Sequence, residues 1–278
     1  MQAGKIDVIG DIHGMHRTFL ALLDQLGWRR IAGTWKHPEG RRLVQVGDLV
    51  DRGPDSLGVV ETMKEMCESG VAHHVIGNHE YNALAWFVPL VPNDPSSGYV
   101  RSRNPGHFKQ FSTTFRQIEE NPSRWDGLAA WIRRQPLHLE MHGLRFVHAA
   151  WIPTYVALLP HNLDSDDTIR RCGHGQSYAP AIDVCLKGPE ERSAPHIDDH
   201  GIRRRVRRIA WWERYPADSP IVCFGHHWFR GTPSPAPSSA GNAYCLDYSC
   251  GRGGPLVAWR YPERYFVSVS NQDVTPLG

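Results

Sequence analysis

The most constraining feature of this sequence is a short, mainly apolar run that ends at a polar side chain, and the sequence repeats it five times. Such runs predict buried strands. In four of the five a glycine precedes the polar residue, which lets the backbone turn sharply at the strand end. The runs, each with the polar residues that follow, are 5–9 with Asp11 and His13, 42–46 with Asp48, 72–76 with Asn78 and His79, 144–147 with His148, and 221–224 with His226.

These five strand ends predict one shared polar site. In sheets with crossover helices, binding sites form outside the carboxyl ends of the strands. Two carboxylates, an amide oxygen and three imidazoles form a mixed oxygen and nitrogen donor set, which suits Mn, Fe or Zn better than Ca or Mg. The candidate ligands are Asp11, His13, Asp48, Asn78, His148 and His226.

The segments between the runs predict an α/β fold. Amphipathic segments at 15–26 and 55–69 predict helices, which gives a βαβαβ unit over the first 80 residues. The alternation weakens after this unit, and the last apolar runs predict antiparallel strands at 243–248, 256–260 and 265–269. We therefore expect a two-layered β-sheet sandwich flanked by helices. We treat residues 1–278 as a single domain, with loop-rich insertions around 88–140 and 159–201 and with segment 89–105 as a loop.

Composition excludes several classes of protein. The 278 residues carry a formal net charge of +2, which argues against a dedicated nucleic-acid coat protein. No apolar run approaches the roughly 18 residues that a membrane span needs. The N-terminus enters strand-like sequence at once and shows no signal peptide, so we expect a cytoplasmic protein with its six cysteines reduced.

Three motifs carry a resemblance to a known family. They are Gly10-Asp11-Ile12-His13-Gly14, Gly47-Asp48-Leu49-Val50-Asp51-Arg52-Gly53 and Gly77-Asn78-His79-Glu80, in this order and separated by helix-sized gaps. Together they resemble the PPP branch of the calcineurin-like metallophosphoesterases. The chain is most similar to small bacterial members: symmetrical diadenosine tetraphosphate hydrolases, lambda-type protein phosphatases and the phosphatase module of polynucleotide kinase-phosphatases.

The resemblance implies a site with two divalent metal ions, with Mn expected first and Fe or Zn as alternatives. A hydroxide that bridges the two metals would attack phosphorus directly. The implied ligands of the first metal are Asp11, His13 and the bridging Asp48. The implied ligands of the second metal are Asp48, Asn78, His148 and His226.

The resemblance also implies the remaining catalytic roles. His79 would protonate the departing oxygen, and Asp51 would orient His79 and keep it protonated. Arg52 and Arg214 would clamp the phosphate oxygens, and Asn78 would also contact the substrate. The match at Arg214 rests only on a short Trp-x-Arg pattern.

Three features depart from the family pattern or have two readings. Ala150 replaces the usual Gly or Asp beside His148, and His227 stands where bacterial members have Thr. We interpret His227 as a packing residue, with a spare ligand or substrate contact as the alternative. The basic run Arg203–Arg208 is either a solvated helix face, with Val206 and Ile209 turned inward, or a rim that attracts a polyanionic substrate.

The function remains open between three hypotheses. The first is a phosphomonoesterase acting on a phosphopeptide, nucleotide or other phosphorylated small molecule. The second is a symmetrical dinucleoside polyphosphate pyrophosphohydrolase. The third is a non-catalytic binding protein on the same scaffold, in which the arginine run would contact nucleic acid. We expect no membrane partner, and the sequence leaves the oligomeric state open.

Overall fold

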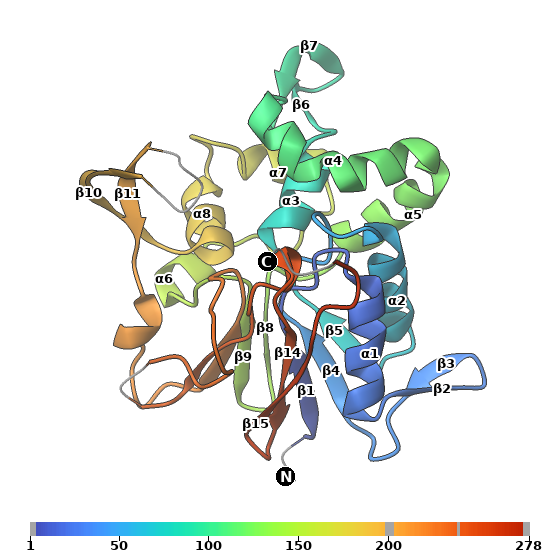
Figure 1. Cartoon of the computed structure of the whole chain (residues 1–278). Coiled ribbons are helices and arrows are strands. Elements are labelled where there is room, and N and C mark those ends of the chain that lie inside the picture. The colour runs from blue at the N-terminus through green and yellow to red at the C-terminus, as the bar shows by residue number, and fades with distance from the viewer. Residues whose placement is uncertain (1–3, 198–202, 238–239, 275–278) are drawn as a thin grey trace.

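The computed structural model describes residues 4–197, 203–237 and 240–274, and two β-sheets form its centre (Figure 1). The first sheet has the order β15-β14-β1-β4-β5. Strands β1, β4 and β5 are parallel, whereas β14 runs antiparallel to β1 and β15 antiparallel to β14. The bounds are β1 Ile6–Ile9, β4 Arg42–Gln45, β5 Ala72–His74, β14 Leu256–Tyr261 and β15 Tyr265–Val269.

The second sheet has the order β13-β12-β9-β8. Strands β8 and β9 form an antiparallel hairpin, and β12 pairs in parallel with both β9 and β13. The prediction that the run from 243 is antiparallel was therefore wrong, whereas it is confirmed for the two last strands. Parallel pairing follows because the long segment 225–242 carries the chain back to the start of the sheet before β13 begins. The bounds are β8 His138–Met141, β9 Leu144–Val147, β12 Ile221–Phe224 and β13 Ala243–Cys245.

The two sheets pack face to face, as the predicted sandwich requires. Val8 and Val44 of the first sheet share a buried cluster with Phe146 and Cys223 of the second. Alternate residues of a strand point to opposite faces, so Ile9 faces the other way and joins the core beneath the helices. Because the two sheets share this core, the carboxyl ends of the strands of both sheets lie close together.

Helices cover the outer face of the first sheet. Helix α1 packs on β14 and β15, and α2 packs on β5. Helix α1 ends at Gly27, whose φ of 97° is left-handed, and Asp55 caps α2 by accepting a hydrogen bond from Gly58 N. The bounds are α1 His16–Leu26, α2 Ser56–Glu68, α3 Asn78–Ala85, α4 Pro105–Glu120 and α5 Pro122–Arg133.

Segment 89–105 contains a hairpin, so its assignment as a loop was wrong. Strands β6 (Pro89–Val91) and β7 (Asp94–Tyr99) form an antiparallel ribbon at the top of Figure 1. Its strands are short and rich in Pro and Ser, so the sequence shows no apolar alternation there. The smaller hairpin β2 (Arg29–Ile31) and β3 (Thr34–Lys36) lies between α1 and β4.

The arginine run forms a strand and not the helix that its first interpretation required. Strand β11 (Arg203–Arg208) pairs antiparallel with β10 (Glu190–Ile197), and Arg207 forms an ion pair with Glu191. Opposite charges facing each other across two strands stabilise this pairing. Part of the predicted loop 159–201 is regular structure, and its residues 198–201 lie outside the described residues. The remaining elements are α6 Pro153–Val156, α7 Asp166–Arg171, α8 Ala179–Lys187, η1 Trp211–Arg214 and η2 Cys250–Arg252.

In the described part of the chain, no helix combines the length and the apolar character that crossing a bilayer requires. The assignment of the whole chain to a single domain stays a prediction.

Candidate metal centre

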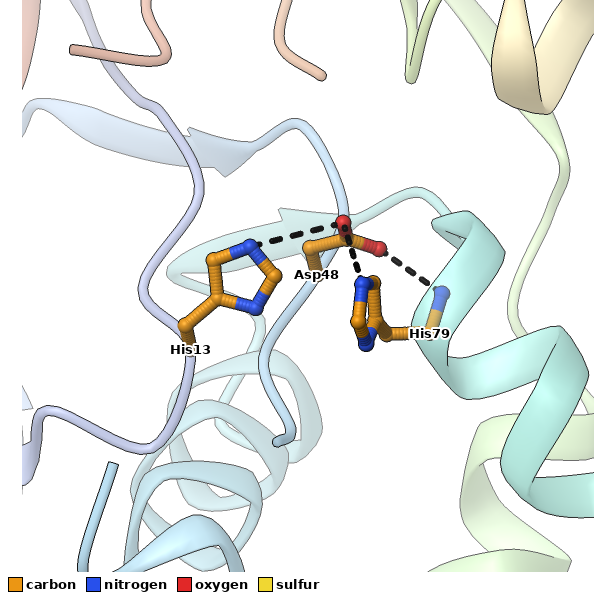
Figure 2. A group of neighbouring side chains, drawn as sticks. All are labelled: His13, Asp48 and His79. Atoms are coloured by element: carbon orange, nitrogen blue, oxygen red, sulfur yellow. Dashed lines mark hydrogen bonds and ion pairs between the residues drawn. The ribbon is translucent and has the colours of Figure 1, made fainter. Parts of the chain in front are cut away.

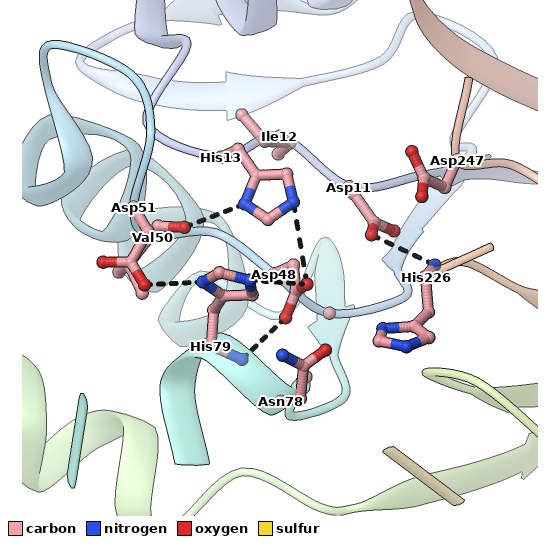
Figure 3. Close-up of polar contacts among 12 residues, drawn as sticks. Asp11, Ile12, His13, Asp48, Val50, Asp51, Asn78, His79, His226 and Asp247 are labelled. Atoms are coloured by element: carbon pink, nitrogen blue, oxygen red, sulfur yellow. Dashed lines mark hydrogen bonds and ion pairs between the residues drawn. The ribbon is translucent and has the colours of Figure 1, made fainter. Parts of the chain in front are cut away.

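The structure brings all six predicted ligands together at the strand ends, and Figure 3 labels five of them, all except His148. Two groups of donor atoms, each within 4.8 Å of one another, form there: His13, Asp48 and His79 in one group, and Asp48, His148 and His226 in the other. Asn78 joins the second group, because its Oδ1 lies 3.0 Å from His148 Nε2. Asp11 joins through its Oδ2, which accepts a hydrogen bond of 3.1 Å from His226 N.

Asp48 lies at the centre of this arrangement. Its Oδ2 is 3.7 Å from His13 Nε2 and 3.3 Å from His148 Nε2. The same oxygen is 3.9 Å from His79 Nε2, while Oδ1 accepts a hydrogen bond of 2.9 Å from His79 N (Figure 2). One carboxylate therefore belongs to both donor groups.

The backbone at the site is held in unusual conformations. Five site residues that are not glycine have positive φ, between 51° and 73°: His13, Asp48, Asp51, Arg52 and His226. Left-handed backbone at such residues is costly and persists only where surrounding contacts enforce it. The sharp turns that aim these side chains inward are thus built into the loops after β1, β4 and β12.

Glu80 makes several of the contacts that hold this backbone in place. It is fully buried, and its carboxylate accepts hydrogen bonds from the backbone nitrogens of Asp48, Leu49 and Gly77 at 2.6 to 2.9 Å. It thereby ties the loop after β4 to the start of α3. The sequence analysis assigned Glu80 no role, although a Glu three residues after the N-cap is the residue that in a capping box accepts from the N-cap nitrogen, as Glu80 does from Gly77 N.

The donor atoms fit divalent cations. Asp11 Oδ1, His13 Nε2 and His226 Nε2 are buried, and none has a hydrogen-bond partner within the described residues. The other ring nitrogens of two histidines are oriented by carbonyl oxygens: His13 Nδ1 donates to Val50 O at 3.0 Å, and His148 Nδ1 lies 2.9 Å from Val46 O. Such carbonyl contacts are the usual way to direct Nε2 of a histidine toward a metal.

The electrostatics of the site also suit cations. Burial lowers the pKa values of His13 and His226, so both rings are neutral and their nitrogens can act as ligands. Burial, together with the carboxylates of Asp247 and Asp48, raises the pKa of Asp11 well above its usual value. Carboxylates crowded together without water repel one another, and positive charge placed among them relieves that repulsion.

His79 and Asp51 form a close pair beside the donor groups. His79 Nδ1 donates to Asp51 Oδ2 at 2.5 Å, and Thr114 Oγ1 donates to Asp51 Oδ1 at 2.7 Å. Burial lowers the pKa of His79, but the carboxylates of Asp48 and Asp51 outweigh burial and raise it. The pair therefore favours a protonated imidazole whose Nε2 faces Asp48.

The two predicted arginines differ in position. The Arg52 guanidinium carbon lies 4.6 Å from the centre of the Trp228 ring, and its buried Nε has no hydrogen-bond partner among the described residues. Arg214 is exposed at the end of η1, and within the described structure no hydrogen bond or ion pair joins it to the six ligands. After burial, the positive charge of Arg208 is the largest influence that lowers the pKa of His226.

His227 lies where a packing residue is expected. Its Nε2 is 2.9 Å from Ala149 O, and its ring packs edge-on against Trp212. Burial lowers its pKa to about 3. The neighbourhood of His148 is ordered in the same way, because Ala149 O also accepts a hydrogen bond from Trp211 Nε1.

Asp247 is a site residue that the sequence analysis missed. It is buried, its Oδ2 accepts a hydrogen bond of 2.8 Å from Trp228 N, and its Oδ1 accepts one of 2.9 Å from Ser249 N. It lies next to Asp11 and His226 in Figure 3. The signal was present, because Asp247 ends an apolar run just as Asp48 does.

Comparisons with known proteins agree with this geometry. The family model described as "Calcineurin-like phosphoesterase" matches residues 4–247. The chain is 31% identical over 269 residues to the asymmetrical bis(5'-nucleosyl)-tetraphosphatase PrpE of Geobacillus thermodenitrificans (strain NG80-2), covering 95% of this chain and 93% of the relative. It is 32% identical over 266 residues to the same-named protein of Geobacillus sp. (strain WCH70), covering 95% and 94%.

Solved structures show the same fold. A protein provisionally assigned as a diadenosine tetraphosphatase aligns with a TM-score of 0.57 at 21% identity, covering 98% of this chain and 96% of that one. A yeast (Saccharomyces cerevisiae) serine/threonine phosphatase similar to human PP5 aligns with a TM-score of 0.57 at 14% identity, covering 99% and 82%. The chain belongs to the calcineurin-like metallophosphoesterases, hydrolases that act on phosphate ester or anhydride bonds.

Proposed function

We propose that this protein is a phosphohydrolase that uses two divalent cations to cleave a phosphoanhydride bond of a dinucleoside tetraphosphate. The observation that carries the two-cation site is the position of Asp48, whose carboxylate belongs to two donor groups at once. The names of the relatives, which are similar over nearly the whole chain, support the choice of substrate.

The ligand assignment follows from the orientation of the side chains. The first cation would be held by Asp11, His13 and Asp48, because Asp11 Oδ1 and His13 Nε2 are buried without hydrogen-bond partners among the described residues. His79 also lies in that donor group, but its Nδ1 is held by Asp51, which suits a proton donor better than a ligand. The second cation would be held by Asp48, Asn78, His148 and His226.

The roles of the other side chains follow from their chemistry. When bound, two divalent cations neutralise the phosphoryl group and lower the pKa of water so that it can attack. Arg52 would bind the phosphate oxygens, since a guanidinium fork matches them in shape and charge. His79 would donate the proton on Nε2 to the departing oxygen, and Asp51 would hold its ring in place. A second phosphate-binding role for Arg214 is supported only by the family pattern.

Two alternatives differ in the bond that breaks. Asymmetrical cleavage of diadenosine tetraphosphate gives ATP and AMP, whereas symmetrical cleavage gives two molecules of ADP. The relatives are named asymmetrical, which favours the first pattern over the symmetrical one suggested by the sequence. A phosphomonoesterase would instead release orthophosphate from a phosphopeptide or from p-nitrophenyl phosphate.

A product-resolved assay of the Mn-loaded enzyme tests the proposal. We expect ATP and AMP from diadenosine tetraphosphate, with kcat/KM well above that for p-nitrophenyl phosphate. Two ADP would instead establish symmetrical cleavage, and orthophosphate release with no tetraphosphate cleavage would establish a phosphomonoesterase. No hydrolysis of any substrate with Mn, Fe, Co, Ni or Zn would leave the binding-protein hypothesis.

Asp48→Asn tests the shared carboxylate. We expect loss of activity and fewer than two bound metal ions per chain by elemental analysis, because the change removes charge from both donor groups. Asp24→Asn is a matched control, since Asp24 lies on the exposed face of α1 and pairs with Arg29 at the start of β2. If Asp48→Asn keeps two metal ions and full turnover, Asp48 does not bridge the two metal ions.

A cytoplasmic location of the protein stays a prediction.

A further inference from the structure

Trp228 holds two arginines at the edge of the metal centre. The guanidinium carbon of Arg52 lies 4.6 Å from the centre of its ring, and that of Arg252 lies 2.9 Å away. The guanidinium carbons of Arg52 and Arg252 are therefore no farther apart than the sum of these two distances. All three side chains are half-buried. Cation–π contacts of this kind restrict the long arginine side chains.

The helical turn η2 places Arg252 directly beside the site. A Cβ added to Gly251 would lie 2.5 Å from Arg52 Cδ and 2.6 Å from His13 Cδ2, so the backbone of η2 packs against both residues. Trp228 follows the predicted ligand His226 by two residues, and its backbone nitrogen is fixed by Asp247. Both η2 and Trp228 therefore contact residues of the site directly.

Two guanidinium groups held this close to the donor groups make this edge of the site strongly positive, so it attracts anions. A phosphomonoester carries one phosphate, and the cations and Arg52 already account for it. A polyphosphate chain carries further negative charge on the neighbouring phosphates, within reach of a second guanidinium. The Arg52–Trp228–Arg252 cluster thus matches a linear polyphosphate better than a single phosphate.

We propose that Arg252 is a substrate-binding residue that contacts the phosphate next to the one attacked and so selects polyphosphates over monoesters. This inference rests on the proposed function, and it extends that function with a residue that the family motifs do not include. The indole of Trp228 keeps the Arg252 fork in place before the substrate arrives, which reduces the ordering cost of binding.

The test compares Arg252→Ala and Arg252→Lys with the wild-type Mn-loaded enzyme. A charge-assisted hydrogen bond contributes about 1.5–3 kcal/mol, so Arg252→Ala should lower kcat/KM for diadenosine tetraphosphate about 10- to 100-fold more than for p-nitrophenyl phosphate. This decrease in kcat/KM should come mainly from a higher KM, with kcat changed little. Arg252→Lys keeps the charge but not the fork, so it should recover part of the loss. Arg264→Ala, an exposed arginine in the turn between β14 and β15, is the control.

The outcomes separate this inference from the proposed function. The inference fails if the wild type cleaves the tetraphosphate but Arg252→Ala lowers kcat/KM equally for diadenosine tetraphosphate and p-nitrophenyl phosphate. Arg252 would then be only structural. An equal loss in Arg252→Ala and Arg252→Lys also overturns it, because charge would then not matter. If the wild type does not cleave the tetraphosphate, the proposed function itself fails, whatever the variants do.

Discussion

At the scale of single residues, His13 and His226 differ from His79 in what they can do. His13 and His226 are neutral and present a buried Nε2 without a partner among the described residues. His79 has its Nδ1 bound to Asp51 and a raised pKa. Chemically identical side chains thus acquire different roles from what lies within a few ångströms of each ring.

His79→Asn should separate the proton donor from the ligands. We expect a loss of roughly 10²–10⁴ in kcat on substrates with a poor leaving group, which is the usual contribution of a general acid. The loss on p-nitrophenyl phosphate should be smaller, because its leaving group needs little protonation. Elemental analysis should still find the metal ions of the wild type. Equal losses on both substrates would show that His79 does not act as the acid.

At the scale of elements, the loops after the strands set the site, and they depend on close contacts that only glycine permits. A Cβ on Gly225 would overlap Asp11 Oδ1, and Asp11 is held on its other oxygen by His226 N. The loops after β1 and β12 are therefore packed against each other through a carboxylate. This contact joins residues more than 200 positions apart in the sequence.

Gly225→Ala should push the Asp11 carboxylate away from its place. We expect weaker metal binding and at least tenfold lower activity at limiting Mn, with partial recovery as the Mn concentration rises. Gly127→Ala is the matched control, because Gly127 lies on α5 with open space at its Cβ, where alanine favours the helix by about 0.5–1 kcal/mol. Unchanged metal affinity in Gly225→Ala would mean that Asp11 moves without consequence.

At the scale of the whole molecule, the C-terminal strands complete the first sheet through a buried charge network. Arg41, almost fully buried, donates to Asp7 Oδ1 of β1 at 2.7 Å and to Glu263 Oε1 at 2.7 Å. Arg260 of β14 donates to the same Asp7 oxygen at 2.9 Å. The network joins β1, the start of β4 and the turn after β14, the last of which lies beyond the matched family residues 4–247.

Glu263→Gln should reveal the acid dependence of this network. The hydrogen bond from Arg41 lowers the pKa of Glu263 to about 2, so the pair stabilises the fold above about pH 4.5 and loses this effect as the pH falls toward 2. Because Glu263 is partly exposed, the effect at pH 7 should be at most about 1 kcal/mol. Urea unfolding at pH 7, 5 and 3 should show the difference from wild type shrink at pH 3. A constant difference would contradict the assignment.

The sequence by itself determined the five strands that lead to the site, their polar ends and the six candidate ligands, because apolar runs and glycine turns are local patterns. Tertiary structure alone decided what those patterns cannot encode. It made β13 parallel to β12 and turned the arginine run into a strand, because pairing with β10 outweighs local propensity. It also placed Glu80, Asp247 and Arg252 at the site, since their roles depend on contacts with loops far away in the chain.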